Sequence, residues 1–450
     1  MSVDGGTKKG SPPSSNKSVF SSWFSGGTFF DAVLMEASQQ IGQSILTLPW
    51  IFANMGFSLA IILLILVSCA GMWTQNLLIS LLVEYRKEKY FIAKRAALVN
   101  NMPAAVADND DNAGPIWGTF SIFIVILALG GLSVAQIIST SSNLYLLNWG
   151  IDKRLLSCIV GAVVSLTCFI PTYREYRAFT FLGLIATTYT GWYMTITSLV
   201  EGPIPNVDYT GPTTLQSFFT CFSAMLFMFG THAAGMEKAD VMNKPSRYDV
   251  AYGWSILYVY TITLPNGIAG YYRFGSEAAT QQNAFYLFDE TVFRQISVVL
   301  MCLHEVVAFG LFAGPLFVMT EKVLKIDHKH YLLKVFVRYI IVGIMLLIAI
   351  ALPFFGVMNS LVGAFSTSLA TYIIPAVAYN KHYNTRDKFD SKAKNAPLNA
   401  NYMTTKTINW SIAALIFIFG LCMGGWASAV TMVEQAESIG NGFFAKCYKC

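Results

Sequence analysis

The chain has 450 residues, of which 54% are hydrophobic and only 12% charged, and its mean hydropathy is +0.52. Soluble domains carry roughly twice that share of charged residues, so the composition excludes an ordinary soluble protein and predicts a membrane protein. The net charge of +5 reflects 30 basic against 25 acidic residues. The basic residues are dispersed and form no stripe of the kind that binds nucleic acid.

The N-terminal segment, residues 1–28, is rich in Ser, Gly, Lys and Pro. It has too little apolar area to offset the entropy of ordering, so we expect a disordered cytosolic tail. No charged region leads into a short apolar core and a cleavage site, so no signal peptide is predicted. The first apolar run is therefore expected to stay in the membrane as an anchor.

Apolar runs long enough to cross a bilayer follow in chain order. We predict eleven spans, at residues 29–51, 57–83, 117–147, 155–170, 179–200, 215–236, 250–272, 292–319, 335–353, 357–379 and 408–430. The longest segments between them, 84–116 and 380–407, are polar loops without a domain of their own. The sequence thus predicts one transmembrane transporter domain over residues 29–430, with 431–450 as an extracellular C-terminal segment.

The orientation follows from the basic residues, because cytoplasmic loops keep the positive excess. With the N-terminus inside, most lysines and arginines fall on the inner side, Lys238 among them. Lys153, Arg154, Arg273 and Arg294 fall outside, with two lysines of the C-terminal segment. This predicts a cytosolic N-terminus and an extracellular C-terminus.

Two of the predicted spans are interrupted by polar and helix-weakening residues. The first contains SQQIGQSILTLPW from Ser38, and the sixth contains FMFGTHAAGME from Phe227. These spans are five apart, as a five-plus-five inverted repeat requires when corresponding helices break near the midplane to expose backbone groups to a substrate. Ordinary helix packing also uses glutamine and glycine, so the pairing of the two spans carries the inference.

Candidate substrate-binding residues at these breaks are Gln40 and Gln43 in the first span and Thr231 and His232 in the sixth. No lysine or arginine is evident at mid-span, so glutamine amides and half-helix N-termini are the expected donors to an anion. An imidazole in the membrane is costly and can accept a proton near neutral pH, which makes His232 a candidate for proton coupling. Its alternative role is that of a hydrogen-bonded packing histidine.

Weaker candidates lie in other spans. In the third span, Gln136, Ser139 and Asn143 either line a cavity or bond across helices. In the eighth, His304 and Glu305 form a second ionisable pair, and His304 is the rival proton-coupling residue. Because adjacent helical residues point in different directions, only one of them is expected to face a given cavity. Glu36 is either functional or simply close to the membrane surface.

The sequence indicates no cofactor, metal site or enzyme. No metal-ligand spacing, nucleophile motif or phosphate loop occurs. Six of the eight cysteines lie in or beside spans, where a free thiol packs as a small apolar group. Cys447 and Cys450 form a C-x-x-C on the predicted outer side, where a disulfide is chemically permitted.

Several stretches resemble the plant auxin influx carriers of the amino acid/auxin permease family. They are GGTFFDAVLMEASQQIGQSILTLPWIFANMG, TFLGLIATTYTGWY, FMFGTHAAGME, HEVVAFGLFAGPLFVMTEKV, ALPFFGVMNSLVGAFSTSLATYIIP and the terminal FFAKCYKC. The resemblance runs from about Gly26 to Cys450. It implies an all-α LeuT-like fold of two five-helix repeats with broken helices 1 and 6, plus an eleventh helix. It also implies proton-driven import of indole-3-acetic acid across the plasma membrane.

The resemblance extends to single residues. Gln40, Gln43, His232 and His304 match positions of the family pattern, as do Thr47, Leu48, Pro49 and Glu237. Three residues depart from it, which puts fine specificity in question. Glu36 stands where the family usually has a small neutral residue, Glu305 where it often has Gln, and Arg273 where it has a small residue.

Two other functions remain open on the sequence alone. A proton-coupled symporter of neutral amino acids would share the architecture and differ in its ligand. A membrane receptor would bind a ligand without transporting it. The expected partners of the carrier are indole-3-acetic acid, protons and the lipid bilayer, with no nucleic acid.

Overall fold

The computed structural model describes residues 27–98, 115–170, 176–209, 211–326, 330–392 and 400–438. Most of the predicted N-terminal tail, and the C-terminal end with Cys447 and Cys450, lie outside these residues. Within them, the first helix begins after Thr28, whose hydroxyl accepts from the backbone N–H of Asp31 while the Asp31 carboxylate accepts from the backbone N–H of Thr28. This reciprocal cap satisfies donors at the helix start. The last helix runs on to Ser438, beyond the predicted end of the eleventh span.

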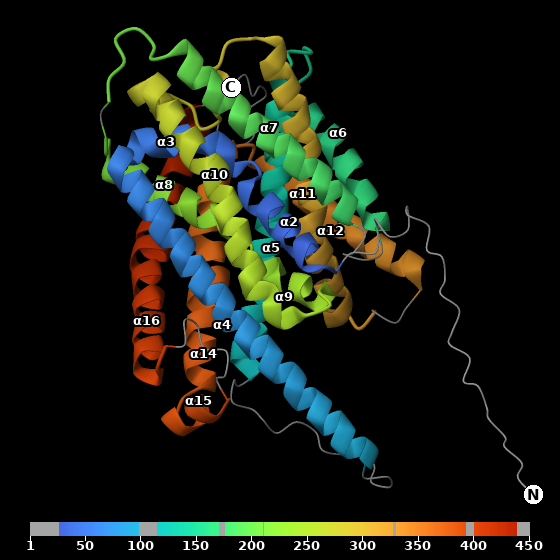
Figure 1. Ribbon diagram of the computed structural model, residues 1–450. Coiled ribbons are helices and arrows are strands. Elements are labelled where there is room, and N and C mark those ends of the chain that lie inside the picture. The colour runs from blue at the N-terminus through green and yellow to red at the C-terminus, as the bar shows by residue number, and fades with distance from the viewer. Residues whose placement is uncertain are drawn as a thin grey trace, which may run out of the picture.

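The described residues form helices and connecting segments, with no strand among them (Figure 1). The main helices are α2 (Phe29–Ile41), α3 (Ser44–Met55), α4 (Phe57–Leu98), α5 (Pro115–Tyr145), α6 (Lys153–Ser165), α7 (Arg177–Glu201), α8 (Leu215–Met228), α9 (His232–Val241), α10 (Tyr248–Phe274), α11 (Val292–Val323), α12 (Tyr331–Ala351), α13 (Phe355–Val362), α14 (Ile374–His382), α15 (Arg386–Lys392), α16 (Tyr402–Leu415) and α17 (Gly425–Ser438). Two π-helical stretches, η6 (Gly363–Ile373) and η8 (Ile416–Gly424), make α13–α14 and α16–α17 continuous.

Every predicted span coincides with a helix or a set of consecutive helices. Seven of them are long and apolar enough to cross a membrane by length and hydropathy alone. The first, fourth, fifth and seventh spans fall short of those criteria for identifiable reasons. The first is split into α2 and α3, and α6 has only 13 residues. The other two, α7 and α10, are long enough but carry more threonine, tyrosine and glycine.

The structure differs from the prediction in the two long segments between spans, 84–116 and 380–407. Segment 84–116 was expected to be a loop, but α4 continues to Leu98. The extension is rich in Glu, Lys, Arg and Ala, which favour helix in any solvent. The second segment, 380–407, contains the short helix α15 before α16 begins. The hydropathy pattern shows where an apolar run ends. The helix itself can continue beyond that point when the following residues favour helix.

Both expected helix breaks are present. The first falls at Gly42 and Gln43, between α2 and α3. The second spans Phe229 to Thr231, between α8 and α9. A Cβ atom at Gly230 would lie 2.5 Å from the Thr367 side chain, so a glycine is required for η6 to approach this break. The break pair predicted from the sequence is therefore confirmed.

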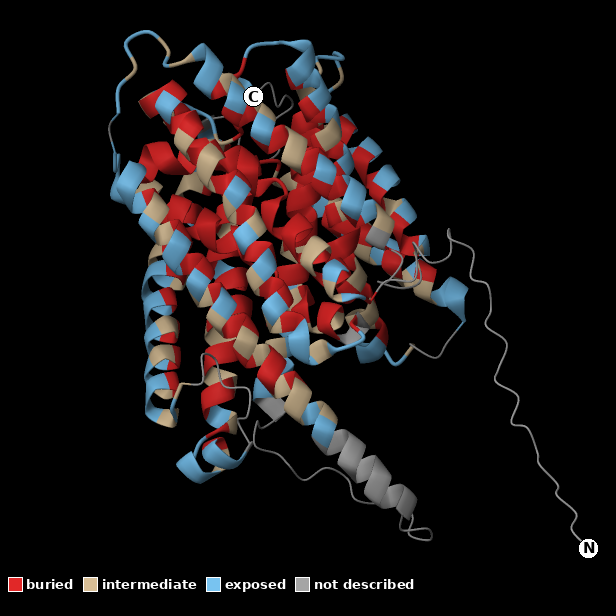
Figure 2. Ribbon diagram, in the orientation of Figure 1, coloured by how far each residue is buried: buried red, intermediate tan, exposed pale blue. Residues whose placement is uncertain are grey.

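The broken helices lie inside the bundle, and other helices cover them (Figures 1 and 2). Helix α3 is buried over its whole length and packs against α8 and α10. Many large apolar side chains point outward on the covering helices, including Leu66, Leu182, Trp254, Leu332, Phe336, Leu347, Phe417 and Ile418. An apolar exterior around a polar-lined interior is the arrangement expected of a protein whose solvent is lipid.

Candidate functional site

A buried carboxylate, Glu36 of α2, lies on the N-terminal side of the first helix break. Four side chains donate hydrogen bonds to it. The donors are the Gln40 amide at 3.1 Å, the Thr231 hydroxyl, the Lys238 ammonium and the Tyr248 hydroxyl. These donors come from α2, the second break, α9 and the start of α10. The Glu36 carboxylate therefore connects the helix before the first break with residues at and after the second break.

Lys238 was expected in the inner loop, and the structure corrects that expectation. Its ammonium is fully buried, forms an ion pair with Glu36 and also donates to Gln39 Oε1 at 2.6 Å. The position is six residues after the start of α9, so the helix that follows the break carries it into the interior. The charge count could not show this, because a lysine near a span end looks the same whether it faces water or a buried carboxylate.

A second buried carboxylate, Glu305 of α11, is held from α5. Ser139 donates its hydroxyl to it, and the Asn143 amide donates to both carboxylate oxygens, at 3.0 and 3.2 Å. Asn143 in turn accepts from Asn283 at 2.8 Å. Ser139 and Asn143, predicted as cavity-lining or cross-helix residues, thus bond across helices to a carboxylate. Among the described residues, Glu305 forms no ion pair.

His304, next to Glu305 on α11, faces a different helix, as expected for adjacent residues. Its Nδ1 lies 3.1 Å from the carbonyl oxygen of Gly183 on α7. Its Nε2 is buried with no hydrogen-bond partner and lies 3.4 Å from where a Cβ would sit on Gly42. The ring nitrogen therefore faces the break in the first span.

His232 begins α9 and packs against α4. Its Nε2 lies 2.9 Å from the carbonyl oxygen of Gly71 and 3.1 Å from the hydroxyl of Thr74. Its Nδ1 is buried without a partner, and the rings of Tyr252 and Tyr372 lie beside the imidazole. The packing interactions expected of a structural histidine are present, together with one nitrogen left open.

Gln43 and Gln136 are separate from these clusters. The Gln43 amide donates to Asn359 Oδ1 of α13 at 3.1 Å, and its own Oε1 has no partner. The Oε1 of Gln136 and that of Gln40 are likewise buried and unpartnered. Buried polar atoms normally find a partner in protein or water, so open ones around two helix breaks favour a site that takes up a polar ligand.

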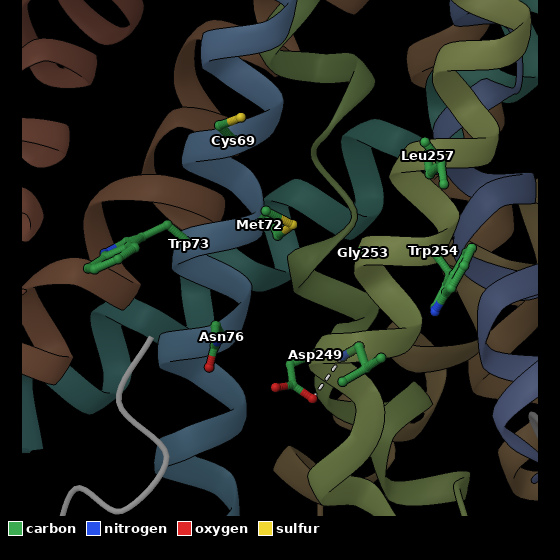
Figure 3. A pocket seen from close by; sticks show the side chains of 9 residues that line it. Cys69, Met72, Trp73, Asn76, Asp249, Gly253, Trp254 and Leu257 are labelled. Carbon is green, nitrogen blue, oxygen red and sulfur yellow. Dashed lines mark hydrogen bonds between the residues drawn. The ribbon is translucent and has the colours of Figure 1, made fainter. Parts of the chain in front are cut away.

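The hollow drawn in Figure 3 is elsewhere, between α4 and α10. Its volume is about 600 Å³, and its lining includes Met72, Trp73, Asp249 and Trp254. Met72 and Trp254 are exposed on the outer surface of the bundle. The hollow is therefore a groove on the exterior. None of the predicted site residues lines it. No cluster of His, Cys, Asp or Glu able to hold a metal occurs within the described ranges.

Solved structures of a manganese transporter share the overall fold of this chain. A point mutant of the Eremococcus coleocola transporter is 14% identical, with a TM-score of 0.58 over 96% of this chain and 90% of that one. The same transporter bound to an aromatic bis-isothiourea compound gives a TM-score of 0.56. The likeness shows a LeuT-like transporter fold, as predicted, and at this identity it shows the fold alone.

The sequence comparisons narrow the class. The profile of the transmembrane amino acid transporter proteins matches residues 25–432. A rice protein named auxin transporter-like protein 1 is 37% identical, covering 94% of this chain and 86% of its own. Auxin transporter-like protein 3 of Arabidopsis thaliana is 35% identical, covering 98% of this chain and 94% of its own. The chain belongs to the amino acid/auxin permease family of membrane transporters, in the branch of the auxin transporter-like proteins.

Proposed function

We propose that this chain imports auxin, indole-3-acetic acid, together with protons across the plasma membrane by alternating access. The observation that carries the proposal is the pair of helix breaks lined by buried, unpartnered polar atoms, in a chain 35–37% identical to proteins named auxin transporters. The N-terminus is placed in the cytosol and the C-terminus outside, on the distribution of basic residues.

The ligand's chemistry fits the lining of the breaks. Indole-3-acetate is an anion with a flat apolar body, so it needs donors for its carboxylate and apolar or aromatic walls for its ring. The donors at the breaks are the Gln43 amide, which also donates to Asn359, and the N-terminus of α9. Phe227 and Phe229 are buried at the second break, and Trp50 is buried in α3. Lys238 is already neutralised by Glu36, which argues against a permanent cation as the anion's anchor.

Uptake of labelled indole-3-acetate into cells that express the chain tests the proposal. We expect saturable uptake that rises with an inward proton gradient and falls when a protonophore collapses the gradient. The neutral acid also crosses lipid unaided, so cells lacking the carrier set the baseline. Binding without saturable uptake would indicate a receptor instead.

A proton-coupled symporter of neutral amino acids is the second candidate, favoured by the amino acid transporter profile that matches the chain. Competition between tryptophan and indole-3-acetate separates the two. An auxin carrier loses little indole-3-acetate uptake to excess tryptophan and takes up tryptophan poorly. The reverse result assigns the amino acid as the substrate.

The proton is assigned to His232, with His304 as the rival, because each leaves one buried ring nitrogen without a partner. His232→Gln keeps a polar side chain that cannot bind a proton. Accumulation against a gradient should then collapse, and the carrier-specific rise on external acidification should flatten, while exchange of indole-3-acetate across the membrane persists. If His304→Gln abolishes the pH response and His232→Gln keeps it, the role moves to α11.

A further inference from the structure

Glu305 is a buried ionisable group that the proposed transport cycle does not yet use. Its side chain is fully buried at mid-length of α11, within a span. A carboxylate inside a membrane is costly, and such residues mark ion and proton pathways more often than they serve packing. Glu305 is also one of the positions at which this chain departs from the family pattern.

No cation compensates Glu305 within the described residues. The charged side chains on the helices around α11 are engaged with one another, in the pairs Glu36–Lys238, Glu237–Lys322, Glu201–Arg273 and Glu321–Arg338. Three more cations lie at the helix ends that the charge distribution assigns to the outer side. Lys153 and Arg154 are at the start of α6, and Arg294 is at the start of α11, where it pairs with Glu290. On α11 itself, the Cys302 thiol donates to the Thr140 carbonyl and His304 faces α7.

The neighbours of Glu305 suit both of its protonation states. As a carboxylate it accepts from the Ser139 hydroxyl and the Asn143 amide. When it is protonated, the Ser139 hydroxyl can rotate and accept from the new O–H, since a hydroxyl is both donor and acceptor. An ion pair would instead favour the charged state alone. The contacts therefore position a carboxyl group without fixing its charge.

The polar contacts lead from Glu305 toward the outer side. Asn143 lies one turn from the end of α5, and Asn283, which donates to it, lies in the segment between α10 and α11. The charge distribution places that segment outside. The two asparagines orient the carboxyl group and mark the side from which it is reached. They are positioning residues, since a neutral amide does not carry the proton.

We propose that Glu305 binds a proton from the outer side and releases it to the inner side in each transport cycle. The carboxylate takes up one proton to become the acid, and loss of that proton inside restores it. The chain would then move one proton more per substrate than a carrier that relies on a histidine alone. This rests on the proposed proton-coupled transport for its role in the cycle, but proton binding by Glu305 stands without it.

Infrared difference spectroscopy on the purified protein in lipid tests proton binding directly, with no substrate. Acidification should produce a carbonyl-stretch band of a protonated carboxyl group that is lost in Glu305→Gln and retained, at a shifted frequency, in Glu305→Asp. The matched control is the double variant Glu36→Gln/Lys238→Met, which removes a buried carboxylate that is paired with a lysine and should keep the band. A band that persists in Glu305→Gln, or no band in the wild type, overturns the proposal.

The transport arm measures the ratio of protons to substrate from the accumulation of indole-3-acetate as the pH gradient is varied. We expect Glu305→Gln to lower that ratio by one. An unchanged ratio overturns the role in coupling even where the infrared band is lost. Absence of saturable uptake in the wild type contradicts the proposed substrate, and the infrared result then still decides whether Glu305 binds a proton.

Discussion

Glu36 and Glu305, both almost fully buried near the helix breaks and along α11, are stabilised by opposite means. Glu36 has a lysine beside it and is 1% exposed, whereas Glu305 is 0% exposed and has only neutral donors. Burying a charge costs several kcal/mol unless it is paired and hydrogen-bonded. Glu36 meets that cost with a partner of opposite charge, the Lys238 ammonium. Glu305 meets it with hydrogen bonds that serve either protonation state, which leaves proton uptake as a second way to remove the charge.

The contrast also concerns which elements each carboxylate joins. Glu36 connects α2 with α9 and α10, on the side of the breaks that the basic residues assign to the cytosol. Glu305 connects α11 with α5, and the contact continues through Asn143 to Asn283 toward the other side. An ion pair is suited to holding two half-helices together. A carboxyl group without an ion pair is suited to binding and releasing a proton.

The largest effect is expected when Glu36 loses its cation. Lys238→Met leaves a charge buried without a partner, which costs about 3–5 kcal/mol. Thermal unfolding of the purified protein should show a large loss of stability, and surface expression should fall. The double variant Glu36→Gln/Lys238→Met should recover most of the loss, because it removes both charges. A Lys238→Met protein as stable as the wild type would show that Glu36 resembles Glu305 after all.

A smaller, pH-dependent effect is expected at Asn143, which donates to Glu305. Asn143→Leu removes one amide donor, whose hydrogen bond to a charged group is worth about 1.5–3 kcal/mol. The loss of stability should be greatest where Glu305 is ionised and smaller in acid, where a protonated carboxyl depends less on that donor. Unfolding at neutral and acidic pH measures the difference. Thr231→Val is the matched control, measured at the same two pH values, because it removes a hydroxyl donor from Glu36, the carboxylate that pairs with Lys238.

The smallest effect is expected when Glu305 itself is neutralised. Glu305→Gln keeps the shape and one acceptor oxygen, and no cation is left unpaired. It should therefore cost only about 0.5–1.5 kcal/mol, the net worth of an ordinary hydrogen bond. Chemical denaturation of both proteins in the same detergent gives the comparison. A destabilisation as large as that of Lys238→Met would reveal a structural role for the charge.

The sequence predicted the architecture well because hydropathy and breaks are local signals. Gly42, Gln43 and Gly230 stand out in apolar runs, and the five-span offset between them implies the repeat. The pairing of charges was not accessible in this way. Lys238 and Glu36 are about two hundred residues apart, so only the fold shows that they meet. A lysine seven residues past one predicted break, with an acid six residues before the other, is a signal that could have indicated the pair.

The candidate site was located more coarsely than the fold. The positions of Ser139 and Asn143 suggested a polar face on the third span, but which residue they serve depends on how α5 packs against α11. Gln40 looked available for a ligand, and in the structure its amide donates to Glu36. Residue type and spacing show which side chains are polar at membrane depth, while packing decides which of their atoms are already engaged.

The ion pair between Glu36 and Lys238 also constrains how such a sequence can diverge. Either charge acquired alone is stranded in the interior, at a cost that is a large share of the stability of most proteins. A lineage can therefore gain or lose the two only together, or through a neutral intermediate at one position. Homologous chains should carry both charges or neither, and the two positions should covary across an alignment. The pair would then serve as a marker that separates this chain's lineage from relatives with a small neutral residue at the first position.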